Sequence, residues 1–142
     1  MRLHYLLIVA IWLLQSSMVI AEEKATQILV VTNVESVGEL NKKQIKQIYL
    51  EGGINFPVKP VTISSGAKIR SVFNAKVIGL TDSRIKAYWA QMKFTGRASP
   101  PKELASVEEV IKFLNDNPGY IAYIPASTKI PEKLHVVYSI NY

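Results

Sequence analysis

The segment from Val61 to Phe73 is the sequence feature that most constrains the fold of this chain. A short run of β-branched residues breaks at Ser64-Ser65-Gly66, and apolar residues then recur with helical spacing as far as Phe73. β-branched runs favour strands, serine and glycine favour turns, and apolar residues at i, i+3 and i+4 favour a helix. The segment therefore predicts a strand, a tight turn and a helix, which is the alternation found in α/β folds.

The turn of this segment, Ser64-Ser65-Gly66, has the composition of an anion-binding turn. The first turn of a helix offers unpaired backbone N–H groups and the positive end of the helix dipole, and hydroxyl groups and a cation commonly accompany an anion there. Arg70 lies one helical turn further along, so its guanidinium can reach back toward the turn. The structural alternative is that Ser64 or Ser65 caps the helix and that Arg70 is a solvated side chain.

The first 21 residues are predicted to be a secretory signal peptide. Arg2 gives a basic start, an apolar stretch runs from Leu6 to Leu14, and Val19 and Ala21 provide the small residues that precede a cleavage site. A transmembrane anchor is the competing interpretation, but the stretch is shorter than the roughly 20 residues that span a bilayer. We expect cleavage after Ala21, which makes residues 22–142 a periplasmic domain.

The sequence contains no cysteine. Disulfides and a lipid-modified cysteine are therefore both excluded, and the exported domain must be stabilised by its hydrophobic core. Residues 22–142 are enough for one domain of ordinary size and too few for two lobes. We therefore expect a single domain without a lipid anchor.

The chain is basic, with 17 lysines and arginines against 11 acidic residues and a formal net charge of +6. A positive charge favours anionic partners. However, the cations are scattered, and only Lys42, Lys43 and Lys46 form a close group. Because neither an arginine-rich arm nor an aromatic stacking motif accompanies them, we predict that nucleic acid is not a partner.

The remaining sequence predicts further strands and helices in alternation. Asn41 with Gln44, and Ser106 with Glu109, are typical of capping boxes that open helices, and Thr81 is a further helix cap. Strands are predicted for 27–32, 58–63, 120–124 and 134–140, and a stiff basic loop for 94–101.

The order of these segments predicts the fold class. The dense β-branched run 27–32 is typical of a strand buried in a parallel sheet, and strand, helix and strand up to residue 63 predict a right-handed βαβ crossover. We therefore predict a single α/β domain with helices packed on a mainly parallel sheet of about four or five strands.

The residues that usually carry catalysis or bind metals are sparse. His135 is the only histidine after the predicted signal peptide, and it lies within a strand pattern. Asp82 and Asp116 lie at helix ends, and Glu108 and Glu109 belong to a first helical turn, where the dipole favours acids. Since nucleophile motifs and phosphate-binding loops are also missing, we predict that the protein is not an enzyme and uses neither a metal nor a cofactor.

Four segments occur in a recognisable order, namely 40–52, 65–73, 88–101 and 118–123. In this order they resemble the periplasmic phosphate-binding proteins of ABC importers, and more closely the short single-domain relatives in the type 2 periplasmic-binding-protein superfamily. The resemblance covers residues 27 to 140. It implies the fold of one lobe of such a protein. It also implies a small oxyanion, phosphate above all, held by backbone N–H groups, hydroxyls and an arginine.

The resemblance also implies which residues bind the anion. The Ser-Gly-Thr turn of that family falls on Ser65-Gly66-Ala67, so the threonine hydroxyl is missing, and the basic residue that follows is Lys68 or Arg70. A single lobe also leaves a half-site that is open to water. The predicted ligand-binding residues are Ser64, Ser65, Gly66 and Arg70, with Thr95 and Arg97 as further contacts.

The leading hypothesis is a periplasmic solute-binding module of the phosphate-binding-protein type. The alternative is an interaction or sensory accessory that has lost the ligand and docks on a membrane transporter, porin or sensor kinase, as the missing lobe and Ala67 suggest. A homodimer that completes the site is a third hypothesis. The last is an exported hydrolase that uses His135 with Ser64 and Ser65.

Overall fold

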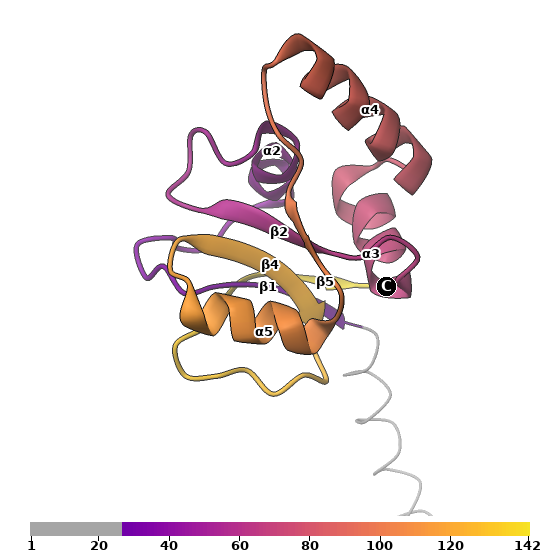
Figure 1. The fold of residues 1–142 in the computed structure, drawn as a ribbon. Helices are drawn as coiled ribbons and strands as arrows, with labels where there is room; N and C mark the ends of the chain where they lie inside the picture. The colour runs from indigo at the N-terminus through magenta and orange to yellow at the C-terminus, as the bar shows by residue number, and fades with distance from the viewer. Residues whose placement is uncertain (1–26) are drawn as a thin grey trace, which may run out of the picture.

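The computed structural model describes residues 27–142. The predicted signal peptide and its cleavage after Ala21 therefore lie outside the described residues. Figure 1 shows a twisted sheet with helices on both of its faces. The strands are β1 (Gln27–Thr32), β2 (Lys59–Ile63), β3 (Lys102–Leu104), β4 (Tyr120–Pro125) and β5 (His135–Asn141). The helices are α2 (Lys42–Glu51), α3 (Lys68–Phe73), the π-helix η1 (Asn74–Ile78), α4 (Asp82–Thr95) and α5 (Val107–Asp116).

The predicted single α/β domain is confirmed, and its sheet is mixed. The five strands have the order β3-β2-β4-β1-β5. β2 is parallel to β3 and β4, whereas β1 is antiparallel to β4 and β5. The short edge strand β3 was not predicted, because its three residues Lys102–Leu104 carry little β signal of their own. Only pairing with β2 makes this segment a strand.

Two of the predictions about β1 are wrong. β1 was expected in a parallel sheet, but both of its neighbours are antiparallel to it. Its β-branched run reflects complete burial of Ile28, Val30 and Val31, and burial does not specify strand direction. The predicted right-handed crossover is also wrong, since β4 lies between β1 and β2 and these two strands run in opposite directions.

The core lies on both faces of β4. Tyr123 packs against Phe73 of α3, with ring centroids 4.0 Å apart, and against Tyr49 of α2 at 6.0 Å. Tyr120 lies on the opposite face of the same strand and packs against Phe113 of α5, with ring centroids 4.8 Å apart. α2 and α3 therefore cover one face of the sheet and α5 covers the other (Figure 1).

Most of the predicted caps are confirmed. Asn41 and Gln44 form the full capping box of α2, with reciprocal backbone-to-side-chain hydrogen bonds of 3.0 and 2.9 Å. Ser106 accepts from the backbone of Glu109, but the Glu109 carboxylate accepts from Ala105 rather than from Ser106.

Among the described residues, every helix is too short or too polar to cross a membrane.

Candidate functional site

The turn after β2 is not a serine-capped helix start. α3 begins at Lys68, and its N-cap is Ala67, which makes no side-chain cap. The backbone N–H of Ala67 instead donates to the Ser64 carbonyl over 3.2 Å, and Gly66 provides the positive φ of +93° that the turn requires. The alternative in which Ser64 or Ser65 caps the helix is therefore wrong.

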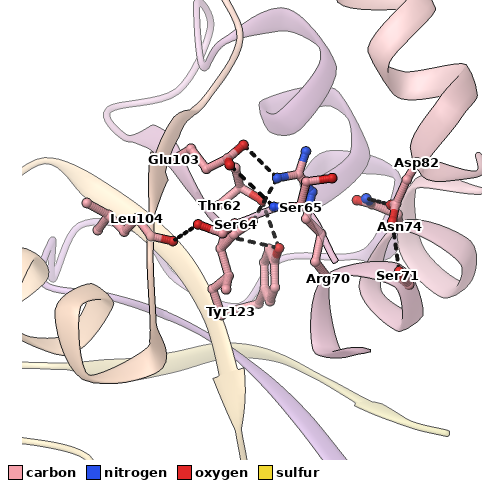
Figure 2. A network of polar contacts seen from close by, with 11 residues as sticks. Thr62, Ser64, Ser65, Arg70, Ser71, Asn74, Asp82, Glu103, Leu104 and Tyr123 are labelled. Atoms are coloured by element: carbon pink, nitrogen blue, oxygen red, sulfur yellow. Dashed lines mark hydrogen bonds and ion pairs between the residues drawn. The ribbon is translucent and has the colours of Figure 1, made fainter. Parts of the chain in front are cut away.

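Ser64 connects this turn to the edge strand β3. Its backbone N–H donates to the Leu104 carbonyl over 2.8 Å, and its hydroxyl donates to the same carbonyl over 3.2 Å. The Ser64 hydroxyl therefore points toward β3 (Figure 2). The parallel register pairs Thr62 with Glu103 and Ile63 with Leu104. This register places the Glu103 side chain beside the turn.

Arg70 reaches back to the turn, as the sequence predicted. Its Nη1 donates to the Ile63 carbonyl over 2.8 Å and to Glu103 Oε2 over 2.7 Å. The Arg70 side chain is only 14% exposed, so the alternative of a solvated arginine is wrong. The hydrogen bond from Arg70 holds the pKa of Glu103 below its ordinary value.

Glu103 occupies the position that the sequence assigned to an oxyanion. One of its carboxylate oxygens accepts from Arg70 Nη1, and the other accepts from the backbone N–H of Ser65 over 3.3 Å (Figure 2). Sequence reasoning missed Glu103, because 33 residues separate it from Arg70 and the strand that carries it was not predicted. A charged residue that follows Pro-Pro in a loop gives no signal for this contact.

A small cavity adjoins the Arg70 guanidinium. Its volume is about 60 Å³. The polar residues of its lining are Thr62, Arg70, Asn74 and Glu103, and the others are Tyr49, Leu50, Ile78, Ile85, Trp89, Pro100 and Pro101. The Nε atom of Arg70 is buried and has no hydrogen-bond partner in the described part of the chain. Arg70 therefore lines the cavity and also retains one buried donor without a partner.

Asn74 and Asp82 hold the helical side of this cavity in place. Asn74, the first residue of the π-helix η1, donates to Asp82 over 2.6 Å, and Ser71 donates to the other carboxylate oxygen over 2.7 Å. Partial desolvation would raise the pKa of Asp82, but these two hydrogen bonds and the charge of Arg70 together lower it. π-helical turns frequently occur at functional sites. Here the turn begins at a residue that lines the cavity.

Thr62 and Tyr123 complete the polar network below the turn. Their hydroxyl groups lie 2.8 Å apart, and the backbone N–H of Ile63 donates to the Tyr123 hydroxyl over 3.4 Å (Figure 2). The end of β2 is therefore joined to β4 by side chains as well as by the sheet.

The structure does not bring Thr95 and Arg97 to this cluster. The Thr95 hydroxyl donates to the Met92 carbonyl over 3.0 Å at the end of α4. Arg97 lines a separate hollow together with Lys59 and Lys102. Their role as ligand contacts stays a prediction that the geometry at Arg70 does not support.

His135 lies far from the serines in the order of the sheet. It begins β5, which forms the edge opposite β3, and its Nε2 lies 3.3 Å from the Val37 carbonyl. A hydrolase that pairs His135 with Ser64 and Ser65 therefore lacks the required geometry. Residues 27–142 also contain no group of three metal-binding side chains.

The two carboxylates beside Arg70 predict a loss of stability in acid. Because the pKa values of Glu103 and Asp82 are lowered by folding, their contribution is fully present above the ordinary carboxyl range and is lost below about pH 4. The free energy of unfolding, measured by urea titration from pH 7 to pH 3, should fall less steeply in Glu103→Gln/Asp82→Asn. Glu35→Gln, outside this network, should keep the wild-type slope, and equal slopes in all three proteins would contradict the prediction.

Comparison with known proteins defines the class of fold. No family model matches the sequence, and no curated protein matches it. Among solved structures, the fold is similar to an ABC-type phosphate transport receptor from Vibrio cholerae, with a TM-score of 0.56 and 14% identity. The match covers 78% of this chain and 44% of that receptor. The chain therefore has a periplasmic-binding-protein-like fold and spans less than half the length of the receptor.

Proposed function

We propose that this protein is a periplasmic solute-binding module that binds a small oxyanion, phosphate or a similar ion, beside Arg70. The observation that carries the proposal is the state of the Arg70 guanidinium. Its Nη1 is held by a side-chain carboxylate, its Nε is buried without a partner among residues 27–142, and the residue lines a cavity. Arginine is well suited to oxyanions because its donors match two acceptor oxygens.

The contacts of Glu103 support an exchange mechanism. Its two oxygens use the Arg70 guanidinium and the Ser65 backbone N–H, which are donors of the kind that an oxyanion needs. The Glu103 side chain is 48% exposed, so it can leave this position for water. Ion pairs with such exposure contribute only about 0–1 kcal/mol. We infer that an incoming anion replaces Glu103 at Arg70.

The exchange mechanism predicts opposite effects for two variants. Glu103→Gln removes the competing charge while keeping the size of the side chain, so anions should bind more tightly by up to about fivefold. Arg70→Gln/Glu103→Gln also removes the guanidinium without leaving an unpaired charge, so binding should be lost. Titration calorimetry with phosphate, sulfate and carboxylates would measure both effects.

A matched control separates this mechanism from general electrostatics. Glu108→Gln makes the same change of charge in the first turn of α5, and it should leave the affinity for anions within about twofold of the wild type. Two results would contradict the proposal. One is the absence of heat with every anion in both the wild type and Glu103→Gln, and the other is unchanged binding in the double variant.

A second candidate function is an interaction accessory that binds no solute and docks on a membrane transporter, porin or sensor kinase. Glu103 already satisfies Arg70 Nη1 and Ser65 without a ligand, and Phe94, at the end of α4, is 94% exposed. For this function we expect a photo-crosslinker at position 94 to trap one membrane protein in intact cells, while anions have no effect on stability. The homodimer hypothesis instead predicts a change in hydrodynamic size when an anion is added.

A further inference from the structure

The cavity beside Arg70 is polar at one end and apolar elsewhere. Arg70, Asn74 and Glu103 form the polar end, and side chains of Ile78, Ile85 and Trp89 form part of the apolar wall. We propose that the ligand of this site is a small organic monocarboxylate with an apolar body rather than inorganic phosphate. This inference rests on the proposed function and narrows its class of ligand.

The supply of hydrogen-bond donors favours a carboxylate. The Asn74 amide is already committed to Asp82, and the Thr62 hydroxyl is paired with Tyr123. Once Glu103 has been displaced, the donors open to a ligand are Arg70 Nη1 and the Ser65 backbone N–H, and these suit two oxygens. Phosphate has four oxygens on all sides, and those that face the apolar wall would lose their hydrogen bonds to water without replacement.

The charges around the cavity also favour a ligand with a single negative charge. Arg70 is the only cation in the lining, as far as the described residues show, and Glu103 also lines the cavity. Asp82 lies directly behind Asn74 and interacts electrostatically with Arg70. Once Glu103 has left for water, the single guanidinium can neutralise one negative charge. A phosphate dianion would keep an uncompensated charge next to Asp82.

Glu103 is itself an example of the proposed ligand group. It presents a carboxylate to Arg70 and to Ser65, with oxygens at 2.7 and 3.3 Å from the two donors. A free carboxylate in the same place would direct its carbon chain away from these donors, and the apolar wall is available to cover it. The cavity is small, about 60 Å³, so a short carbon chain fits it better than a long one.

Tryptophan fluorescence can test the inference directly. Trp12 and Trp89 are the two tryptophans of the sequence, and Trp89 lines the cavity. In the full chain with Trp12→Phe, as in a chain cleaved after Ala21, tryptophan emission comes from Trp89 alone. We would titrate this protein with acetate, butyrate, hexanoate, inorganic phosphate, sulfate and the neutral butyramide. We expect saturable changes with the carboxylates, with dissociation constants that fall about three- to fourfold for each added methylene until the cavity is full. Phosphate, sulfate and butyramide should have little effect.

Variants keep this test independent of folding defects. In the Trp12→Phe background, Glu103→Gln should bind butyrate more tightly, and Arg70→Gln/Glu103→Gln should lose the response while keeping its far-UV circular dichroism. If phosphate or sulfate binds more tightly than every carboxylate, the inference is overturned and the proposed function stands. If the affinity does not depend on the length of the carboxylate's carbon chain, the inference that the ligand has an apolar body is overturned. If no anion changes the emission or the melting temperature, both the inference and the proposed function fail.

Discussion

Replacing Phe73 by alanine should lower the free energy of unfolding by about 3–5 kcal/mol. Phe73 is fully buried, and its ring stacks on Tyr123 with centroids 4.0 Å apart and an interplanar angle of 12°. Its ring centroid also lies 4.8 Å from that of Tyr49. Because α2, α3 and β4 all contribute to this cluster, the cavity left by the ring cannot be filled by one element moving alone. Urea denaturation at neutral pH would measure the loss.

Phe94 provides the matched control for this substitution. It is 94% exposed at the end of α4, so Phe94→Ala removes the same atoms from a surface position. The expected change in the free energy of unfolding is within about 0.5 kcal/mol. Equal destabilisation by both substitutions would contradict the role of Tyr49, Phe73 and Tyr123 as a stabilising core cluster.

Replacing Gly53 by alanine should destabilise the fold by about 3 kcal/mol or more. Gly53 has a φ of +78°, and a Cβ atom there would lie 2.1 Å from the carbonyl oxygen of Val58. This neighbour is backbone, so it cannot rotate away as a side chain would. Either the turn between α2 and β2 or the start of β2 must shift. The melting temperature and the urea midpoint should both fall clearly.

The variant Gly96→Ala is the control that distinguishes the clash at Gly53 from the general cost of a positive φ. Gly96 has a φ of +68°, and the position that a Cβ atom would take there has no atom within 4 Å beyond its own chain neighbours. Gly96→Ala should therefore cost only about 1 kcal/mol. Equal losses in the two variants would show that the backbone conformation, and not the contact with Val58, governs this turn.

The sequence predicted the contacts of the candidate site that lie within one segment, but not those between segments far apart in the chain. Arg70 was predicted to reach back to its turn because the two are only a helical turn apart, and the structure confirms this. The carboxylate that meets it was not predicted, because Glu103 reaches Arg70 only through the pairing of β3 with β2. Thr95 and Arg97 were grouped with Arg70 by resemblance, and the packing of α4 places them elsewhere.

The sequence by itself determined the features that depend on a few neighbouring residues. The helix caps at Asn41 and Thr81, the turn at Gly66 and the buried runs of β1 and β4 all follow from local hydrogen bonding and from the spacing of apolar side chains. Tertiary structure alone decided the strand order, the directions of the strands, the edge strand β3 and the cavity beside Arg70. These features arise from contacts between residues far apart in the chain, and hydrophobic patterning fixes which residues are buried without fixing which partners they meet.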